Sequence, residues 1–223
     1  MIILPKCYPI SLNVENRLCV VVGGGQVAER KVLSLLECGA RVRLVSPSIT
    51  AGLMDIAGSG RIEIVEDLYR DDCLDGAFLV VGATDSDEVN GRVSVDSMKR
   101  GLLVNVVDDP PRGNFYVPAV VRRGSLQIAV STDGNSPLLA RKIKEQLEAA
   151  FPVEYGDVVS LIGEIREKVI RDNPDPAEKE RLHSSRLDGE TMTLLKEGKF
   201  NRAKERILNA YLGGGSEPQD CSR

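Results

Sequence analysis

The pattern of apolar and polar positions is clearest where a strand breaks into glycines and restarts as a helix. Residues 18–22 are apolar and rich in β-branched side chains, which predicts a strand buried on both faces of a parallel sheet. A stripe at helical spacing follows and ends at Cys38-Gly39. Its members are Val27, Val32, Leu35 and Leu36. Residues 41–45 then alternate as a second strand.

The same succession of strands and helices continues as far as Asp108. Apolar or alternating runs predict strands over 61–66, 78–85 and 102–108, and the intervening spacing predicts helices over 49–56 and 86–100. Strands that alternate with helices are typical of an α/β fold with a parallel sheet. We therefore expect a Rossmann-like sheet in this part of the chain.

After this region the pattern changes. Residues 114–121 and 125–132 predict two strands joined by a polar turn. Ser136 as N-cap and Pro137 at the first helical position predict the start of a helix that runs to about residue 150.

The two ends of the chain give weaker signals. Residues 1–13 indicate a lead-in strand and loop, and the chain is expected to be helical from Asp157 onward. Asp175-Pro176 resembles the start of a further helix, and two short helices follow. The glycine-rich segment 213–223 is assigned no structure.

The glycines after the first strand fit the spacing G-x-G-x-x-G/A through Gly23, Gly25 and Ala28. Gly23 permits a tight turn, Gly25 has no Cβ to hold a pyrophosphate away from the backbone, and Ala28 lets the helix pack close to the strand. The pattern predicts a dinucleotide site. The alternative is a glycine turn in an α/β fold that binds no nucleotide.

One element of the usual dinucleotide pattern is missing. The acidic residue expected about 20 residues on, which binds the ribose hydroxyls, is replaced by Ser46-Pro47-Ser48. No Arg or Lys follows Ser46 immediately to receive a 2′-phosphate. We therefore expect NAD rather than NADP.

These patterns predict four parts: an NAD-binding Rossmann-like domain over 1–113, a small α+β dimerisation and ligand-binding segment over 114–150, a helical domain over 151–212 and a flexible tail over 213–223. The net charge of −4 argues against nucleic acid as a partner. No apolar run of about 18 residues or signal-type segment is present, so we expect a cytoplasmic protein without a membrane partner.

The metal-ligating residue types are sparse. The five cysteines form no C-x-x-C pair, which indicates neither a zinc knuckle nor a redox pair. The single histidine, His183, is expected on a helix surface with no catalytic role. We predict no resident metal site.

Polar residues follow two of the predicted strands where each ends. Because the carboxyl ends of such strands face the ligand crevice, Thr84 and Asp85 are candidates to line the cofactor, although Asp85 as the cap of the next helix is an equal alternative. Asn105 and Asp108 occupy the next strand. A carboxylate beside a nicotinamide can accept a proton, so Asp108 is the candidate general base, with a turn-capping role as its alternative.

A second candidate site is the loop from Ser131 to Pro137 and the helix after it. A helix N-terminus with Arg141 and two nearby lysines suits an anionic ligand. An ordinary cap on a solvated helix face is the alternative.

Four segments together resemble the precorrin-2 dehydrogenase family, which includes the amino-terminal half of siroheme synthase. They are Val22–Lys31, Gly82–Asp85, Asn105–Pro110 and Ala129–Arg141, and the likeness spans residues 1 to about 210. The resemblance implies NAD-dependent oxidation of precorrin-2 to sirohydrochlorin by a homodimer. Some family members also insert iron into sirohydrochlorin, so ferrous or cobaltous ion is a further candidate substrate.

The resemblance also implies roles for individual residues. Asp108 matches the catalytic aspartate, Gln26, Val27, Pro47 and Ser48 match positions that contact NAD, and Ser131 and Thr132 fall in a loop associated with the tetrapyrrole pocket. Thr132 stands where the related bacterial synthase has a serine. The candidate substrate-binding residues are thus Asn105, Ser131, Thr132, Ser136 and Arg141. The rival hypotheses are a regulatory module that senses NAD without chemistry and a chelatase that does not use the cofactor.

Overall fold

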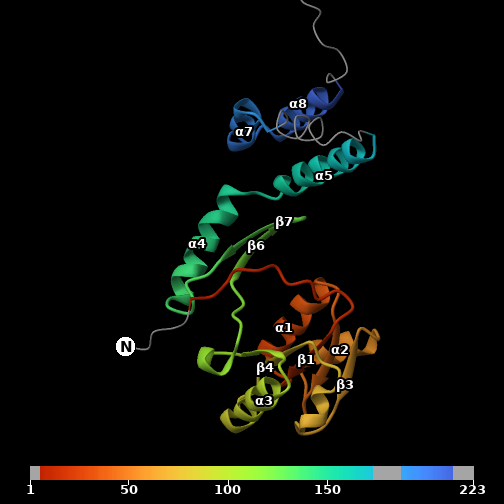
Figure 1. The fold of residues 1–223 in the computed structure, drawn as a ribbon, viewed down its shortest axis with the longest axis vertical. Helices are drawn as coiled ribbons and strands as arrows, with labels where there is room; N and C mark the ends of the chain where they lie inside the picture. The colour runs from red at the N-terminus through yellow and green to blue at the C-terminus, as the bar shows by residue number, and fades with distance from the viewer. Residues whose placement is uncertain (1–5, 173–186, 213–223) are drawn as a thin grey trace, which may run out of the picture. The chain divides into compact units, whose positions relative to one another are not determined.

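The computed structural model of the chain describes residues 6–172 and 187–212. The chain divides into two compact units (Figure 1). Unit 1 consists of Met1–Val117 together with Asp133–Ser136, and unit 2 consists of Pro118–Thr132 together with Pro137–Arg223. His183, Asp175-Pro176, Cys221 and the tail from 213 lie outside the described residues, as do residues 1–5.

Unit 1 is built on a five-stranded sheet in which every pair is parallel. The order across the sheet is β3-β2-β1-β4-β5. The strands are β1 (Leu18–Val22), β2 (Arg41–Val45), β3 (Ile62–Val65), β4 (Leu79–Gly82) and β5 (Leu103–Val106). The connections contain α1 (Gln26–Glu37), α2 (Ala51–Gly58), the 3₁₀ turn η1 (Asp71–Leu74), α3 (Asp87–Lys99) and, after β5, η2 (Pro110–Arg112). The predicted Rossmann-like parallel sheet is confirmed.

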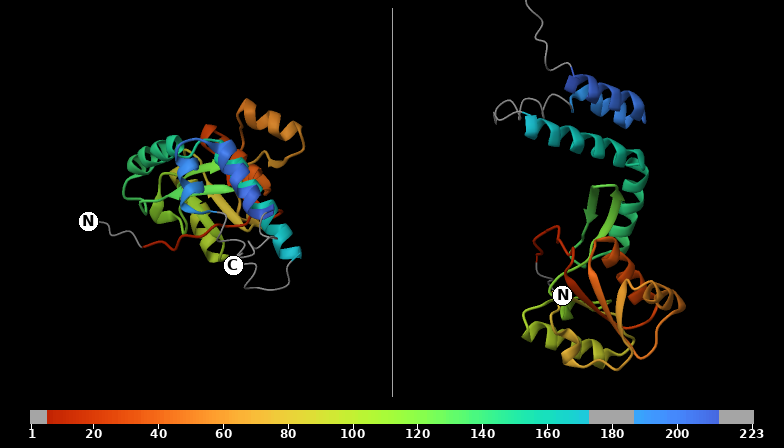
Figure 2. Two further views of the ribbon diagram at one scale, coloured as in Figure 1. Left: turned by 90° about the horizontal axis from the view of Figure 1, so that it is seen from above. Right: turned by 90° about the vertical axis from the view of Figure 1, so that its right-hand side faces the viewer.

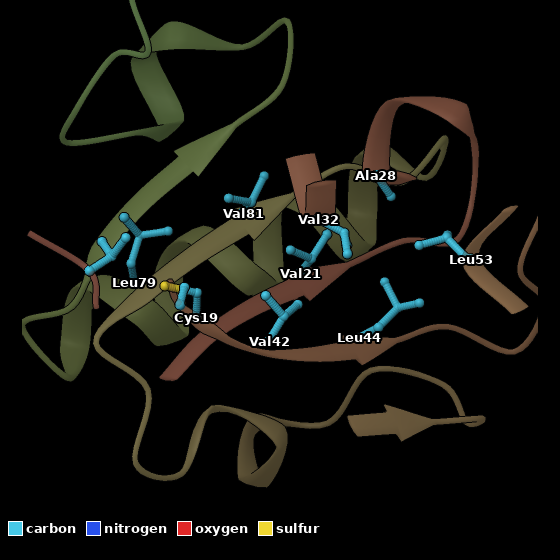
Figure 3. Packing of buried hydrophobic residues seen from close by; sticks show 11 residues of the cluster. Cys19, Val21, Ala28, Val32, Val42, Leu44, Leu53, Leu79 and Val81 are labelled. Carbon is cyan, nitrogen blue, oxygen red and sulfur yellow. The ribbon is translucent and has the colours of Figure 1, made fainter. Parts of the chain in front are cut away.

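The sheet is covered on both faces, which explains its nearly continuous apolar strands. On one face, Cys19 and Val21 of β1 pack with α1 and α2 through Ala28, Val32 and Leu53 (Figure 3). On the other face, the alternate residues of β1 pack with α3 and η1. All five residues of β1 are buried, as its sequence predicts.

The strand register brings four strand ends level. Val22 pairs with both Val45 and Gly82, and Gly82 pairs with Val106. The chain therefore leaves β1, β2, β4 and β5 at one edge of the sheet. In a parallel sheet with this strand order, the carboxyl ends beside the central strand form the ligand crevice.

Unit 2 contains a two-stranded antiparallel ribbon and a group of helices (Figure 2). The ribbon is β6 (Ala119–Arg123) with β7 (Leu126–Val130), and α4 (Pro137–Ala150) packs along it. The helices α5 (Glu154–Asp172), α7 (Gly189–Lys196) and α8 (Phe200–Leu212) share an apolar core that includes Val158, Ile165 and Ile207. As predicted, α4 begins at Pro137.

Several predicted boundaries are wrong. The strand expected over 114–121 begins only at Ala119, because Asn114 instead extends the edge of β5: its side chain accepts from Val104 N at 2.8 Å and donates to Leu102 O at 2.9 Å. Residues 6–13 form no strand and lie exposed.

Two helix starts also differ from the prediction. The helix expected over 49–56 begins at Ala51 because Thr50 caps it, accepting from Leu53 N at 3.3 Å. The helix expected from Asp157 begins at Glu154, where acidic side chains in the first turn favour a helix N-terminus.

Candidate functional site

The crevice at the carboxyl ends of the strands holds a pocket of about 780 Å³. It is lined by the turns that follow β1, β2, β4 and β5, all within unit 1. Among the residues that line it, the charged ones are Asp85 and Asp108. The pocket is therefore bounded by backbone, hydroxyl and apolar groups, with negative charge at two points.

The turn after β1 can be made only by small residues. Gly23 has φ +124°, in the region that favours glycine, and a Cβ built on it would lie 2.2 Å from Ala83 O. Gly25 differs, because a Cβ there would meet no atom within 4 Å. That open space lies at the start of α1, whose first N–H groups have no partners within the helix. A pyrophosphate fits such a cradle.

The turn after β2 lies against the glycine turn. Thr50 N donates to Gly24 O at 3.0 Å, and a Cβ on Gly24 would lie 1.9 Å from Ser48 O. Ser46 is buried and its hydroxyl donates to Ser48 O at 2.7 Å. Gly24 is thus needed for contact between the two turns, a requirement that the G-x-G spacing does not express.

The turn after β4 is held by side-chain hydrogen bonds. Thr84 Oγ1 donates to Asn90 Oδ1 at 2.9 Å, and Asn90 Nδ2 donates to Thr84 O at 2.8 Å. The alternative role of Asp85 as the cap of the next helix is contradicted, because Ser86 caps α3 by accepting from Val89 N at 3.3 Å. Asp85 is exposed and lines the pocket.

Asp108 follows β5 in a conformation that is rare for any residue other than glycine. Its φ is +61°, and its side chain is exposed at the pocket. Within the described part of the chain, its carboxylate accepts no hydrogen bond, so it does not cap the turn. Its neighbour Asp109 is engaged elsewhere, in an ion pair with Arg112 at 3.2 Å. Strained backbone of this kind gathers at functional sites.

A cation that the sequence analysis missed lies within electrostatic reach of Asp108. Burial lowers the pKa of Lys31 on α1, and the neighbouring Arg30 lowers it further, whereas the Asp108 carboxylate acts in the opposite direction. The ammonium group of Lys31 and the Asp108 carboxylate therefore attract each other.

The structure brings all of the predicted cofactor and catalytic residues to one pocket. Those that line it are Gly23, Gly25, Gln26, Val27, Pro47, Ser48, Thr84, Asp85 and Asp108. It is also lined by residues not predicted, including Gly24, Thr50 and Tyr69. The helix-capping pattern at Thr50 was a usable signal, whereas nothing local in the sequence marks Tyr69.

The predicted substrate-binding residues are not among those that line this pocket. Asn105 turns its amide to the backbone and donates to Phe115 O at 3.1 Å. Ser131 and Thr132 follow β7, Ser136 precedes α4, and Arg141 lies exposed on α4.

The cations of α4 are paired along their own helix. Arg141 lies 3.3 Å from Glu145, and Lys144 lies 3.2 Å from Glu148. Such exposed pairs are worth little. An anionic ligand would therefore displace them at small cost.

Within residues 6–172 and 187–212, no group of three or more His, Cys, Asp or Glu side chains is placed to hold a metal ion. No helix in this part of the chain is long and apolar enough to cross a bilayer.

Comparison with known proteins identifies the family of this chain. Residues 10–119 match the family described as putative NAD(P)-binding, and residues 123–150 match the central part of sirohaem biosynthesis proteins. The solved structure of SirC, precorrin-2 dehydrogenase, superposes with a TM-score of 0.75 at 30% identity, and the match covers 90% of this chain and 100% of that one. The chain belongs to the precorrin-2 dehydrogenase family.

The curated siroheme synthases to which this member of the precorrin-2 dehydrogenase family is similar are longer than this chain. The siroheme synthase of Chromobacterium violaceum is 35% identical over 210 residues, 94% of this chain and 45% of that protein. That of Pseudomonas aeruginosa strain LESB58 is 37% identical over 207 residues, 93% of this chain and 44% of that protein. The chain thus spans less than half of these relatives. The family supports a nicotinamide dinucleotide as the ligand of the glycine cradle.

Proposed function

We propose that this protein oxidises precorrin-2 to sirohydrochlorin with NAD as the oxidant. The observation that carries the proposal is the placement of Asp108, an exposed carboxylate held at φ +61°, in the same pocket as the glycine cradle. The relationship to SirC, precorrin-2 dehydrogenase, and to the siroheme synthases supports the choice of substrate.

Different residues of the pocket would bind the cofactor and accept the proton. The first turn of α1 and Gly25 would hold the pyrophosphate, and the turn from Ser46 to Thr50 would hold the adenosine ribose. NAD, when bound, supplies the two-electron acceptor. The oxidation removes one hydride and one proton from the substrate; Asp108 would accept the proton and afterwards release it to solvent.

NAD is favoured over NADP by the charges around the pocket. The charged side chains that line it are both carboxylates. A 2′-phosphate carries about −1.5 to −2 charges and is typically bound by Arg or Lys. The residues that line this pocket include no Arg or Lys to bind the extra phosphate.

The carboxylate-rich tetrapyrrole is proposed to be recognised by Asn105, Ser131, Thr132, Ser136 and Arg141. Arg141 can exchange its weak pair with Glu145 for a substrate carboxylate. Thr132 offers a hydroxyl where the related bacterial synthase has a serine.

The test is an anaerobic absorbance assay with enzymatically generated precorrin-2. We expect the sirohydrochlorin spectrum to appear only with both protein and NAD. The informative variant is Asp108→Asn, because asparagine tolerates the left-handed conformation that alanine does not. It should bind NAD as the wild type does and lose at least about 100-fold in turnover, the usual contribution of a general base.

Asp55→Asn is the control for this variant, because Asp55 is an exposed carboxylate on α2 that does not line the pocket. It should turn over normally. Failure of the wild type to convert precorrin-2 while it still binds NAD would favour the sensing module, and normal turnover by Asp108→Asn would remove Asp108 from the mechanism.

The same assay tests metal insertion, which we propose as a second activity because the siroheme synthases are related over this region. Ferrous or cobaltous ion is added once sirohydrochlorin has formed. A spectral change faster than in a protein-free control would establish chelation, and equal rates would refute it.

We further propose a homodimer. The ribbon of β6 and β7 is a sheet of two strands only, so within the described residues its outer edges have no neighbouring strand. Leu138 on the adjoining α4 is 69% exposed. A second copy would cover both features. Light scattering at micromolar concentration should give twice the chain mass of 24.3 kDa; a monomer would refute the dimer.

We also propose a cytoplasmic location. Cys19 and Cys73 are buried free thiols, a state typical of a reducing compartment. Fractionation of cells should recover the protein with cytoplasmic markers.

A further inference from the structure

The acidic residue that normally discriminates between NAD and NADP is missing from the end of β2. In dinucleotide-binding folds, this residue lies at the end of the second strand and binds the ribose 2′-hydroxyl. Here the position is taken by Ser46, which is buried, uncharged and bonded to Ser48 O at 2.7 Å. The turn therefore needs another source of negative charge if it is to reject a 2′-phosphate.

A carboxylate does lie behind this turn, on a different element. Thr50 Oγ1 donates a hydrogen bond to Glu29 Oε2 of α1. Gly52 lies against the same carboxylate, since a Cβ built there would come within 2.9 Å of both of its oxygens. Glu29 is thus held one hydrogen bond behind Thr50, which lines the pocket.

The hydrogen bonds around Thr50 fix this geometry from three sides. Its backbone N–H donates to Gly24 O at 3.0 Å, its hydroxyl accepts from Leu53 N at 3.3 Å, and the same hydroxyl donates to Glu29. Moving this turn away from α1 and the glycine turn would break the hydrogen bonds to Glu29 and Gly24.

The charge of Glu29 is not cancelled by an ion pair. Within the described residues, no Lys, Arg or His nitrogen lies within 4.0 Å of it. Its neighbour Arg30 is one residue away on the helix, and adjacent residues of a helix do not face each other. Its negative potential therefore extends through Thr50 toward the turn.

We infer that Glu29 is the residue that determines cofactor specificity, supplying from α1 the negative charge that other dinucleotide sites carry at the end of the second strand. It disfavours the 2′-phosphate of NADP by like-charge repulsion and leaves the 2′-hydroxyl of NAD to the Ser48 and Thr50 groups. This inference rests on the proposed use of NAD.

The test compares the binding of NADH and NADPH by wild type and Glu29→Gln. Glutamine keeps an oxygen to accept from Thr50 and removes only the charge. Binding is followed by nicotinamide fluorescence, which is uncomplicated by tryptophan because the chain contains none. We expect the ratio of the NADPH Kd to the NADH Kd to fall at least about tenfold, or about 1.4 kcal/mol, with the NADH Kd nearly unchanged.

One variant controls for the loss of a carboxylate as such, and a second tests the link between Glu29 and the turn. Asp55→Asn removes an exposed carboxylate from α2 and should leave both Kd values unchanged. Thr50→Val removes the hydroxyl that holds Glu29 behind the turn, so the ratio of the NADPH Kd to the NADH Kd should fall as it does in Glu29→Gln.

An unchanged ratio in Glu29→Gln would overturn the inference, as would equal weakening of both cofactors, which would make Glu29 only a positioning residue. Wild-type protein that binds NADH while the ratio fails to move leaves the proposed function intact. Wild-type protein that binds neither cofactor overturns both.

Discussion

Two neighbouring glycines of the nucleotide turn are predicted to fail in different ways when changed to alanine. In Gly24→Ala, the added methyl would lie 1.9 Å from Ser48 O, whereas ordinary contact begins at 3.4 Å. The difference, 3.4 − 1.9 = 1.5 Å, is the distance by which the turn must withdraw. That movement breaks the hydrogen bond from Thr50 N to Gly24 O.

Gly24→Ala should therefore lower the stability of the protein even when no ligand is bound. Loss of one backbone hydrogen bond destabilises a protein by about 1 kcal/mol. For a chain of this size, such a loss lowers the Tm by about 2–4 °C. Since a displacement of about 1 Å at a binding site can cost about 100-fold in activity, NAD binding should weaken as well.

Gly25→Ala should leave the free protein intact. Gly25 has φ −84°, which any residue adopts, and a Cβ there meets nothing within 4 Å. Restricting the unfolded chain gives a stabilisation of about 0.4–1 kcal/mol. The methyl does, however, fill the space proposed for the pyrophosphate, so the NAD Kd should rise at least about tenfold while the Tm stays the same or rises.

Thermal unfolding with and without NAD separates the two outcomes. At a ligand concentration of 100 times the wild-type Kd, binding stabilises by about 2.7 kcal/mol, and a tenfold weaker site by about half of that. Gly163→Ala, on α5 with nothing within 4 Å of the added methyl, is the control for a generic Gly→Ala effect. If NAD raises the Tm of Gly25→Ala as much as it raises that of the wild type, the pyrophosphate cradle is refuted. An unchanged Tm in ligand-free Gly24→Ala would refute the packing of the two turns.

Three further outcomes are expected. Asn114→Ala should lose about 2 kcal/mol of stability in a denaturant titration because both side-chain hydrogen bonds to β5 disappear; an unchanged midpoint would contradict this. Hydrogen bonding to Arg206 holds the pKa of Asp188 below its ordinary 3.8, so the stability it adds is complete above about pH 5 and is lost as the pH falls below 4; Asp188→Asn should flatten that acid limb of the Tm profile, and an unaltered limb would argue against the pair. Burial raises the pKa of the Cys19 thiol to about 11, so at pH 8 Cys19 should react with thiol reagents only as the protein unfolds, whereas labelling in the native state would refute its burial.

The sequence by itself was sufficient for the parts of the fold that depend on local periodicity. The unbroken apolar run of β1 predicts burial on both faces, and all five of its residues are buried. Ser136-Pro137 predicts the start of α4 because the two residues satisfy local backbone geometry. Gly23 and Gly25 were recognisable because their spacing reflects a turn made by consecutive residues.

Contacts between distant segments were decided only by the tertiary structure. The sequence places Asn105 near the end of a strand as a candidate ligand residue, but it does not show that the Asn105 amide donates to the backbone of Phe115, which folds back beside β5. It also missed Gly24, which must lack a side chain because the turn after β2 lies against it.

The same limit applies to the charge near the ribose turn. The sequence shows that no acidic residue ends β2. It does not show that Glu29, which lies 21 positions before Thr50, accepts a hydrogen bond from Thr50 in the turn after β2. Local patterns record the conformation of neighbouring residues and the burial of a face. Which side chains meet across the crevice depends on the strand order and on the level register of the strand ends, and these exist only once the sheet has formed.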